Sequence, residues 1–269
     1  MSNLNIKSLC KSILFFILYA LLLIVFQTLS SIVLMAVAAF KGIRDEEVIT
    51  QFASDNILVS NGVSFILVSL VLILIFKIRK ANIKKEFKLQ KCKAKHLLMS
   101  IALAFSYSIL FFLLTYDNNF ENSEAIHNSV DYYSRFAPGL GFVLMITNLL
   151  VLAPISEELS FRGIIYTRSE SGSSTLIPVI VSSLLFGIMH LSAGGILLVI
   201  GAFVMGFVFS FIFYKTKSLY ACILAHSTAN LPDYIFYNHP KISGTQTVVI
   251  LGISAAIMIA SFVLLYRSE

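Results

Sequence analysis

Long apolar runs separated by short polar segments make up most of the chain. A helix needs about 18 or more apolar residues to cross the hydrocarbon core of a membrane, and a scan for runs of about this length finds roughly eight. Their apolar residues are continuous and do not alternate with polar ones, which disfavours membrane β-strands. We therefore predict an all-α polytopic membrane protein with about eight transmembrane helices, near residues 12–39, 57–76, 97–116, 138–161, 174–192, 195–214, 218–237 and 246–266.

The composition points to the same class. Of 269 residues, 58% are hydrophobic and only 13% are charged, which is more apolar than a soluble globular chain tolerates. Lys7 and Lys11 precede the first run as in a secretory signal, but the run continues to Phe40. A signal has an apolar region of only about 7–15 residues, so we expect this run to stay as a membrane helix.

The polar segments give no sign of a second domain. No internal repeat or low-complexity linker is visible, so we expect a single integral membrane domain over residues 1–269. Cys10, Cys92 and Cys222 are isolated from one another, which supports neither a disulfide framework nor a thiolate metal site.

The charged residues predict the orientation in the membrane. The loops 41–56 and 117–137 are acidic, whereas the segment from Lys77 to Lys95 is the most basic in the chain and contains one acid, Glu86. Lysine and arginine favour the cytoplasmic side, which places both termini in the cytoplasm of what we expect to be a bacterial cell membrane. Next to two spans, this segment is expected to contact anionic lipid and not nucleic acid. Its basic residues are Lys77, Arg79, Lys80, Lys84, Lys85, Lys88, Lys91, Lys93 and Lys95.

Two adjacent carboxylates and an arginine lie at the end of the fourth run. Glu158 and Arg162 are four residues apart and share a helix face, which predicts an internal ion pair. Glu157 points about 100° away and is left free to address a cavity as a general base. On its own, such a cluster could equally mark the cytoplasmic end of a helix.

Two later runs carry histidines at helical spacing. Phe186 and His190 lie one turn apart on one run, and His226 and Asn230 lie one turn apart on another. Unsatisfied imidazole and amide groups are costly in hydrocarbon, so a shared polar cavity is favoured over separate lipid-facing positions.

The three motifs together resemble the CPBP membrane proteins, a family named for CAAX proteases and bacteriocin-processing enzymes and also called Abi. The family pattern E-E-x-x-x-R, F-x-x-x-H and H-x-x-x-N occurs here in that order, each on its own apolar run. The resemblance covers about residues 138–237, which we take as the catalytic core. Its residues are Glu157, Glu158, Arg162, Phe186, His190, His226 and Asn230.

This resemblance implies intramembrane hydrolysis of a peptide bond in a membrane-associated peptide or small protein. Glu157, assisted by His190, would activate water, while His226 and Asn230 would polarise the scissile carbonyl. Two donors on one helix face can also form an oxyanion hole. Glu158, Arg162 and Phe186 would support these groups.

Alternatives remain open at this stage. Zinc could bind Glu157, His190 and His226, but H-E-x-x-H is absent, which favours a mechanism without a metal cofactor. The family resemblance also permits a non-catalytic partner in bacteriocin immunity or sensor-kinase regulation, and buried Glu and His can serve a transporter. Because Glu157 and His190 fall near opposite faces in a simple span model, we expect the fourth helix to continue past Tyr166.

Overall fold

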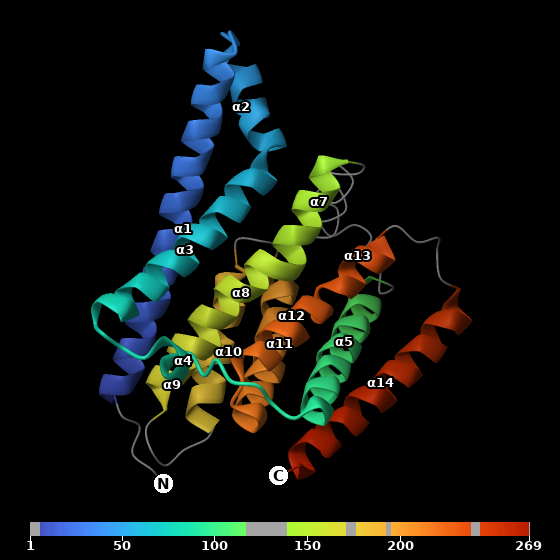
Figure 1. Ribbon diagram of the computed structural model, residues 1–269. Helices are drawn as coiled ribbons and strands as arrows, with labels where there is room; N and C mark the ends of the chain where they lie inside the picture. Colours follow the sequence, from blue (N-terminus) through green and yellow to red (C-terminus); the bar gives the residue numbers. More distant parts are fainter. Residues whose placement is uncertain (1–5, 117–138, 171–175, 192–194, 238–242, 269) are drawn as a thin grey trace.

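Helices form all the regular structure in the part of the chain that the computed structural model describes, which is residues 6–116, 139–170, 176–191, 195–237 and 243–268 (Figure 1). The predicted acidic loop at 117–137 lies outside these residues. The α-helices are α1 (Ile6–Phe40), α2 (Glu46–Asp55), α3 (Ile57–Ile78), α4 (Ile83–Glu86), α5 (Ala94–Tyr116), α7 (Leu140–Thr147), α8 (Ala153–Glu158), α9 (Thr167–Ser169), α10 (Leu176–Met189), α11 (Gly195–Thr216), α12 (Leu219–Ala229), α13 (Leu231–Tyr237) and α14 (Gly244–Arg267). Two π-helical stretches join three of them, η2 (Asn148–Leu152) and η3 (Leu159–Tyr166).

The all-α polytopic class is confirmed. Within the described ranges, six helices are long and apolar enough to cross a membrane, and α10 and α12 are shorter apolar helices. The predicted span at 218–237 is wrong as a single helix, because α12 ends at Ala229 and α13 begins at Leu231. Pro232 explains the break, since proline has no N–H and is tolerated only in the first turn of a helix.

The fourth predicted span is one helix of 30 residues that runs from Leu140 to Ser169. It therefore continues past Tyr166, as expected. Neighbouring helices donate side-chain hydrogen bonds to carbonyl oxygens of its two π-helical stretches. The wider turns of π-helices often mark functional sites, and here they lie on both sides of α8, which carries the two glutamates. The four donors and acceptors are Ser12 to Ile165, Ser182 to Phe161, Ser227 to Leu150, and Asn230 to Leu149.

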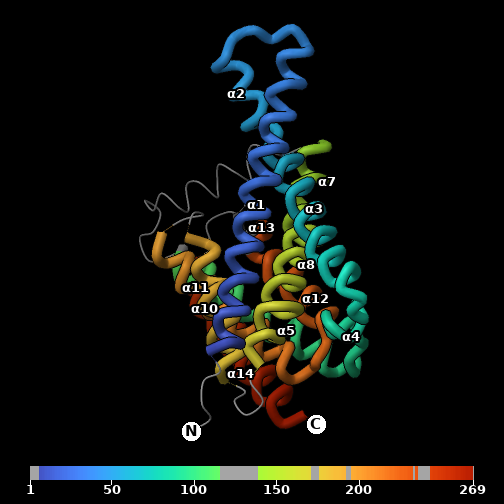
Figure 2. Tube along the Cα trace, turned by 90° about the vertical axis from the view of Figure 1, so that its left-hand side faces the viewer, coloured from blue at the N-terminus to red at the C-terminus, as the bar shows by residue number. Residues whose placement is uncertain are grey.

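The two ends of the helix bundle carry different segments of the chain. The start of α1, the short α4 and the end of α14 lie at one end, and α2 lies at the other, beyond α7 (Figures 1 and 2). At 35 residues, α1 is about 52 Å long, well over the roughly 30 Å of a hydrocarbon core. The end of α1 and the short helix α2 extend beyond the other helices at this end (Figures 1 and 2).

Small residues let α10 and α11 approach closely. A Cβ atom added to Gly206 of α11 would lie 3.0 Å from the Cα atom of Ser183 in α10. Gly187 of α10 is equally tight against Phe203 of α11. Such close approach is typical of membrane helix pairs, and it brings the ring of Phe186 against that of Phe209.

Candidate active site

The ion pair predicted from the spacing of Glu158 and Arg162 is present. Nη1 of Arg162 lies 2.9 Å from Oε1 of Glu158, and both side chains are fully buried. The second terminal nitrogen of Arg162 donates to the carbonyl oxygen of Gly206 at 2.9 Å. Arg162 therefore links the glutamate helix to α11, and its permanent charge supplies the counter-charge for the buried carboxylate of Glu158.

Aromatic rings surround the guanidinium of Arg162. Its central carbon lies 4.8 Å from the ring centre of Phe186, 5.1 Å from that of Phe209 and 5.9 Å from that of Phe161. Ring faces stabilise a desolvated cation by up to about 2 kcal/mol. Phe186, from the second motif, therefore supports the arginine of the first motif.

His226 lies between the two glutamates. Its Nδ1 is 2.9 Å from Oε1 of Glu158, and its Nε2 is 3.9 Å from Oε2 of Glu157. Phe209 stacks on the imidazole with ring centres 4.6 Å apart. Three predicted residues from α8 and α12, 68 positions apart in the chain, thus meet at one point.

The hydrogen bond to Glu158 determines which nitrogen of His226 carries a proton. An ionised carboxylate only accepts hydrogen bonds, so Nδ1–H must be the donor. In the neutral ring, Nε2 then has a lone pair directed toward Glu157. Nε2 can donate a hydrogen bond only when the ring is doubly protonated.

The Glu157 side chain is the more accessible of the two carboxylates. Its exposed fraction is 16%, against 0% for Glu158. The arginine that holds Glu158 agrees with the division predicted from helical geometry. The cavity that Glu157 was expected to face stays a prediction.

His190 joins the cluster through Phe186. Its Nδ1 lies 2.8 Å from the carbonyl oxygen of Phe186, and the two rings are 4.9 Å apart. Because a carbonyl only accepts, Nδ1 donates and Nε2 of the neutral ring is free to accept a proton. Among the described residues, His190 makes no hydrogen bond or ion pair to either glutamate, so its predicted assistance to Glu157 is not a direct contact here.

Asn230 caps α12 one turn after His226. Its Nδ2 donates to the carbonyl oxygen of Leu149 in η2 at 2.8 Å, and the side chain is half-buried. The amide has a second N–H, which leaves one donor for a ligand. The π-helical stretch therefore positions the Asn230 amide through one of its two N–H groups only.

Tyr19, Ser156 and Phe209 belong to the cluster but were not predicted. Tyr19 comes from α1 and is 1% exposed, with its hydroxyl 3.5 Å from the Oγ atom of Ser156. Phe209 lies on His226. Tyr19 is one of several polar side chains in the run 12–39, so its hydroxyl gave only a weak signal, and nothing distinguished Phe209 among 23 phenylalanines.

The zinc alternative requires Glu157, His190 and His226 around one point. In the described part of the chain, no three His, Cys, Asp or Glu side chains gather in a way that could hold a metal ion. The donor set therefore does not fit zinc in this conformation, and the expected absence of a cofactor stays a prediction.

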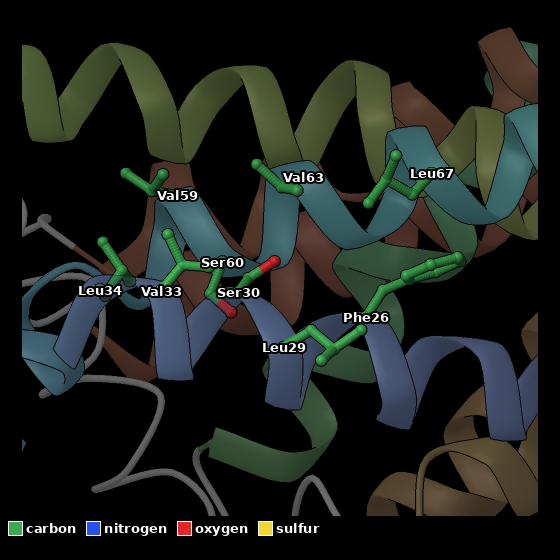
Figure 3. Close-up of a pocket in the computed structure, with 9 residues that line it drawn as sticks. All are labelled: Phe26, Leu29, Ser30, Val33, Leu34, Val59, Ser60, Val63 and Leu67. Atoms are coloured by element: carbon green, nitrogen blue, oxygen red, sulfur yellow. The ribbon is translucent and has the colours of Figure 1, made fainter. Parts of the chain in front are cut away.

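A groove of about 340 Å³ lies elsewhere, between α1 and α3 (Figure 3). It contains none of the predicted site residues. Its walls are aliphatic and aromatic except for two serine hydroxyls, and Figure 3 labels the lining residues as Phe26, Leu29, Ser30, Val33, Leu34, Val59, Ser60, Val63 and Leu67.

The fold and the site define a multi-pass helical membrane protein with a buried cluster of carboxylates, arginine and imidazole. Residues 139–232 match the family model described as "Type II CAAX prenyl endopeptidase Rce1-like", and all seven motif residues lie in this segment. The resemblance to the CPBP family indicated by the three motifs is therefore confirmed for this segment.

Two curated relatives are similar to parts of the chain. An "Uncharacterized protein" of Mycoplasma capricolum is 31% identical over 180 residues, which cover 60% of this chain and 51% of the relative. The "Putative membrane peptidase YdiL" of Bacillus subtilis is 32% identical over 114 residues, which cover 40% of this chain and 46% of the relative. The chain spans about half the length of these relatives. No solved structure matches it.

Proposed function

We propose that the protein is an intramembrane endopeptidase of the CAAX type that hydrolyses a peptide bond in a membrane-associated peptide or small protein. The observation that carries this proposal is His226 between two carboxylates of different character, one paired with arginine and one accessible. In acid–base catalysis, two titratable groups often lie in different surroundings, so that one acts as the acid or base and the other supports it. The family match and the name of the Bacillus subtilis relative support the same reaction class.

In the proposed reaction, Glu157 takes a proton from water as the water oxygen attacks the scissile carbonyl carbon. His190 assists with its free Nε2 from the turn that follows α10, which requires a bridging water or a shift of this turn toward Glu157. When the tetrahedral intermediate collapses, the C–N bond breaks and Glu157 returns its proton to the leaving amine. No metal takes part in any of these steps.

The oxyanion of the intermediate would accept hydrogen bonds from Nδ2 of Asn230 and Nε2 of His226. A single oxyanion donor typically contributes about 2.7–4 kcal/mol to the transition state. Because Glu158 fixes the hydrogen on Nδ1, this role requires doubly protonated His226. Glu158 and Arg162 therefore act on the charge of His226 as well as on the fold.

The first experiment compares new peptide termini in cells that produce the wild-type chain or the Glu157→Gln variant at matched membrane levels. Termini that depend on Glu157 would support proteolysis and identify a substrate. Glu47→Gln is a suitable control, because this exposed acid lies on α2 at the far end of the bundle. Equal termini in wild type and Glu157→Gln would contradict hydrolysis and favour the immunity or regulatory role.

A second measurement tests the metal-free mechanism. The purified wild-type protein should keep its activity after exhaustive chelation and should contain much less than one zinc per chain. Loss of activity that added zinc restores would contradict this part of the proposal.

A further inference from the structure

Asn148, the first residue of the π-helical stretch η2, ties this stretch to helix α3. It is 7% exposed, and its Nδ2 donates to the carbonyl oxygen of Leu58 in α3 at 2.9 Å. The same nitrogen donates to the carbonyl oxygen of Leu144, one turn earlier in its own helix, at 3.0 Å. An amide nitrogen has two hydrogens, so both N–H groups of Asn148 are engaged.

The amide oxygen of Asn148 lies against a glycine of α3. A Cβ atom added to Gly62 would lie 2.9 Å from this oxygen. Gly62 follows Leu58 by four residues, so both lie on one face of α3. Among the described residues, Oδ1 of Asn148 has no hydrogen-bond partner although it is buried. Because an unpaired buried oxygen costs free energy, an apolar residue of this size would pack more favourably, and the asparagine needs another reason to be here.

The next two residues of η2 hold the end of α12 through their carbonyl oxygens. That of Leu149 accepts from Nδ2 of Asn230 at 2.8 Å, and that of Leu150 accepts from Oγ of Ser227 at 2.6 Å. The wider turns of a π-helix change where such carbonyls point. Their positions therefore depend on where η2 begins, which is the residue that Asn148 attaches to α3.

We propose that Asn148 is a positioning residue for Asn230 that acts through the backbone of η2. Its amide fixes the stretch against α3, and the carbonyl of the following residue orients the amide of Asn230. This inference rests on the proposed function, in which Asn230 donates a hydrogen bond to the oxyanion. Asn148 exchanges no proton and forms no bond to substrate. Because the interaction it supports is made in the transition state, its loss should lower kcat and leave KM unchanged.

Asn148→Ala tests this role, because it removes the amide that donates to α3. The probe is a synthetic peptide that spans a bond cleaved in a Glu157-dependent manner, presented to the full-length protein in detergent. We expect kcat to fall about tenfold with KM unchanged. This is a part of the roughly 10²–10³-fold loss that follows removal of a whole oxyanion donor.

A double-variant comparison separates positioning from general damage to the fold. A residue that acts only through Asn230 has nothing left to position in Asn230→Ala. The double variant Asn148→Ala with Asn230→Ala should therefore have the same kcat as Asn230→Ala alone. Damage independent of Asn230 would instead multiply, and the double variant would be slower by about a further tenfold.

Gly62→Ala gives the same test from α3 without removing a donor, since its new Cβ atom must displace the amide of Asn148. We expect the same fall in kcat, again absent in the Asn230→Ala background. If Asn148→Ala yields too little folded protein, this second comparison decides. Asn61→Ala is the matched control, because Asn61 also joins α3 to another helix, where its Oδ1 accepts from Nε2 of Gln27 in α1 at 2.7 Å. Its loss should leave kcat unchanged.

Three results would overturn the role of Asn148 while leaving proteolysis intact. They are wild-type kcat in Asn148→Ala, a raised KM with unchanged kcat, and a double variant about ten times slower than Asn230→Ala. Wild-type turnover in Asn230→Ala would remove the oxyanion role of that residue, and this inference with it. If the wild-type chain cleaves no peptide that depends on Glu157, the proposed function itself fails.

Discussion

Glu157 and Glu158 are neighbours in the chain but differ in what surrounds them, so their substitution should have different effects. Glu157 is 16% exposed and its nearest charged partner is His226 at 3.9 Å. We expect Glu157→Gln to fold at normal yield, because the buried ion pair of Glu158 and Arg162 and the hydrogen bond from His226 to Glu158 stay in place. Removal of a general base typically lowers turnover by about 10²–10⁴-fold. Cleavage rate and unfolding midpoint, measured on the same purified preparation, check both parts, and a Glu157→Gln variant that is active would contradict the assignment.

Arg162 should instead be needed for the folded state. Arg162→Ala leaves the fully buried Glu158 without its counter-charge, which typically costs about 3–5 kcal/mol. Thermal unfolding and folded yield in one detergent measure this cost. Arg168→Ala is the control, because its ion pair with Glu86 is about one-third exposed and should contribute about 0–1 kcal/mol. Equal unfolding midpoints for the two variants would show that the buried pair has no special role.

At the scale of helices, the contact of α10 with α11 determines how closely Phe186 approaches the arginine. In Gly206→Ala the new Cβ atom would meet backbone atoms of Ser183, which cannot move by a change of rotamer. We expect a loss of about 1–3 kcal/mol, as for other overpacked sites, together with lower activity. Gly252→Ala on α14 is the control, since nothing lies within 4 Å of its added Cβ atom and it should be neutral or slightly stabilising. The thermal unfolding midpoints of the two variants measure this difference. Equal midpoints would contradict the prediction, because they would mean that α10 and α11 can move apart without loss of stability.

The helices themselves were largely predictable, because continuous apolar runs are a direct consequence of the hydrocarbon solvent. The ion pair of Glu158 and Arg162 was predictable too, since helical periodicity alone fixes that contact. The π-helical stretches were not, because an additional residue in a turn leaves no pattern in an apolar run. Tyr19 could not be placed either, since its contact with Ser156 joins positions 137 apart and depends on how α1 packs.

At the scale of the whole molecule, the distribution of charge should fix the orientation. The basic segment around α4 lies at the end of the bundle where α1 starts and α14 finishes, and the acidic start of α2 lies at the opposite end. We expect the basic end to face the cytoplasm, because lysine and arginine resist translocation. Single cysteines can test this in a background where Cys10, Cys92 and Cys222 are replaced by alanine. Lys84→Cys and Glu47→Cys are both exposed positions, on α4 and α2.

A membrane-impermeant maleimide should label the Glu47→Cys variant in right-side-out vesicles and the Lys84→Cys variant only in inverted ones. Detergent should expose both sites equally, which controls for reactivity. The reverse labelling pattern would contradict this prediction, because it would show that the acidic end faces the cytoplasm. Glu157 lies just before η3, in the half of the Leu140–Ser169 helix that ends near α4, so the same experiment determines from which side of the membrane a substrate must reach it.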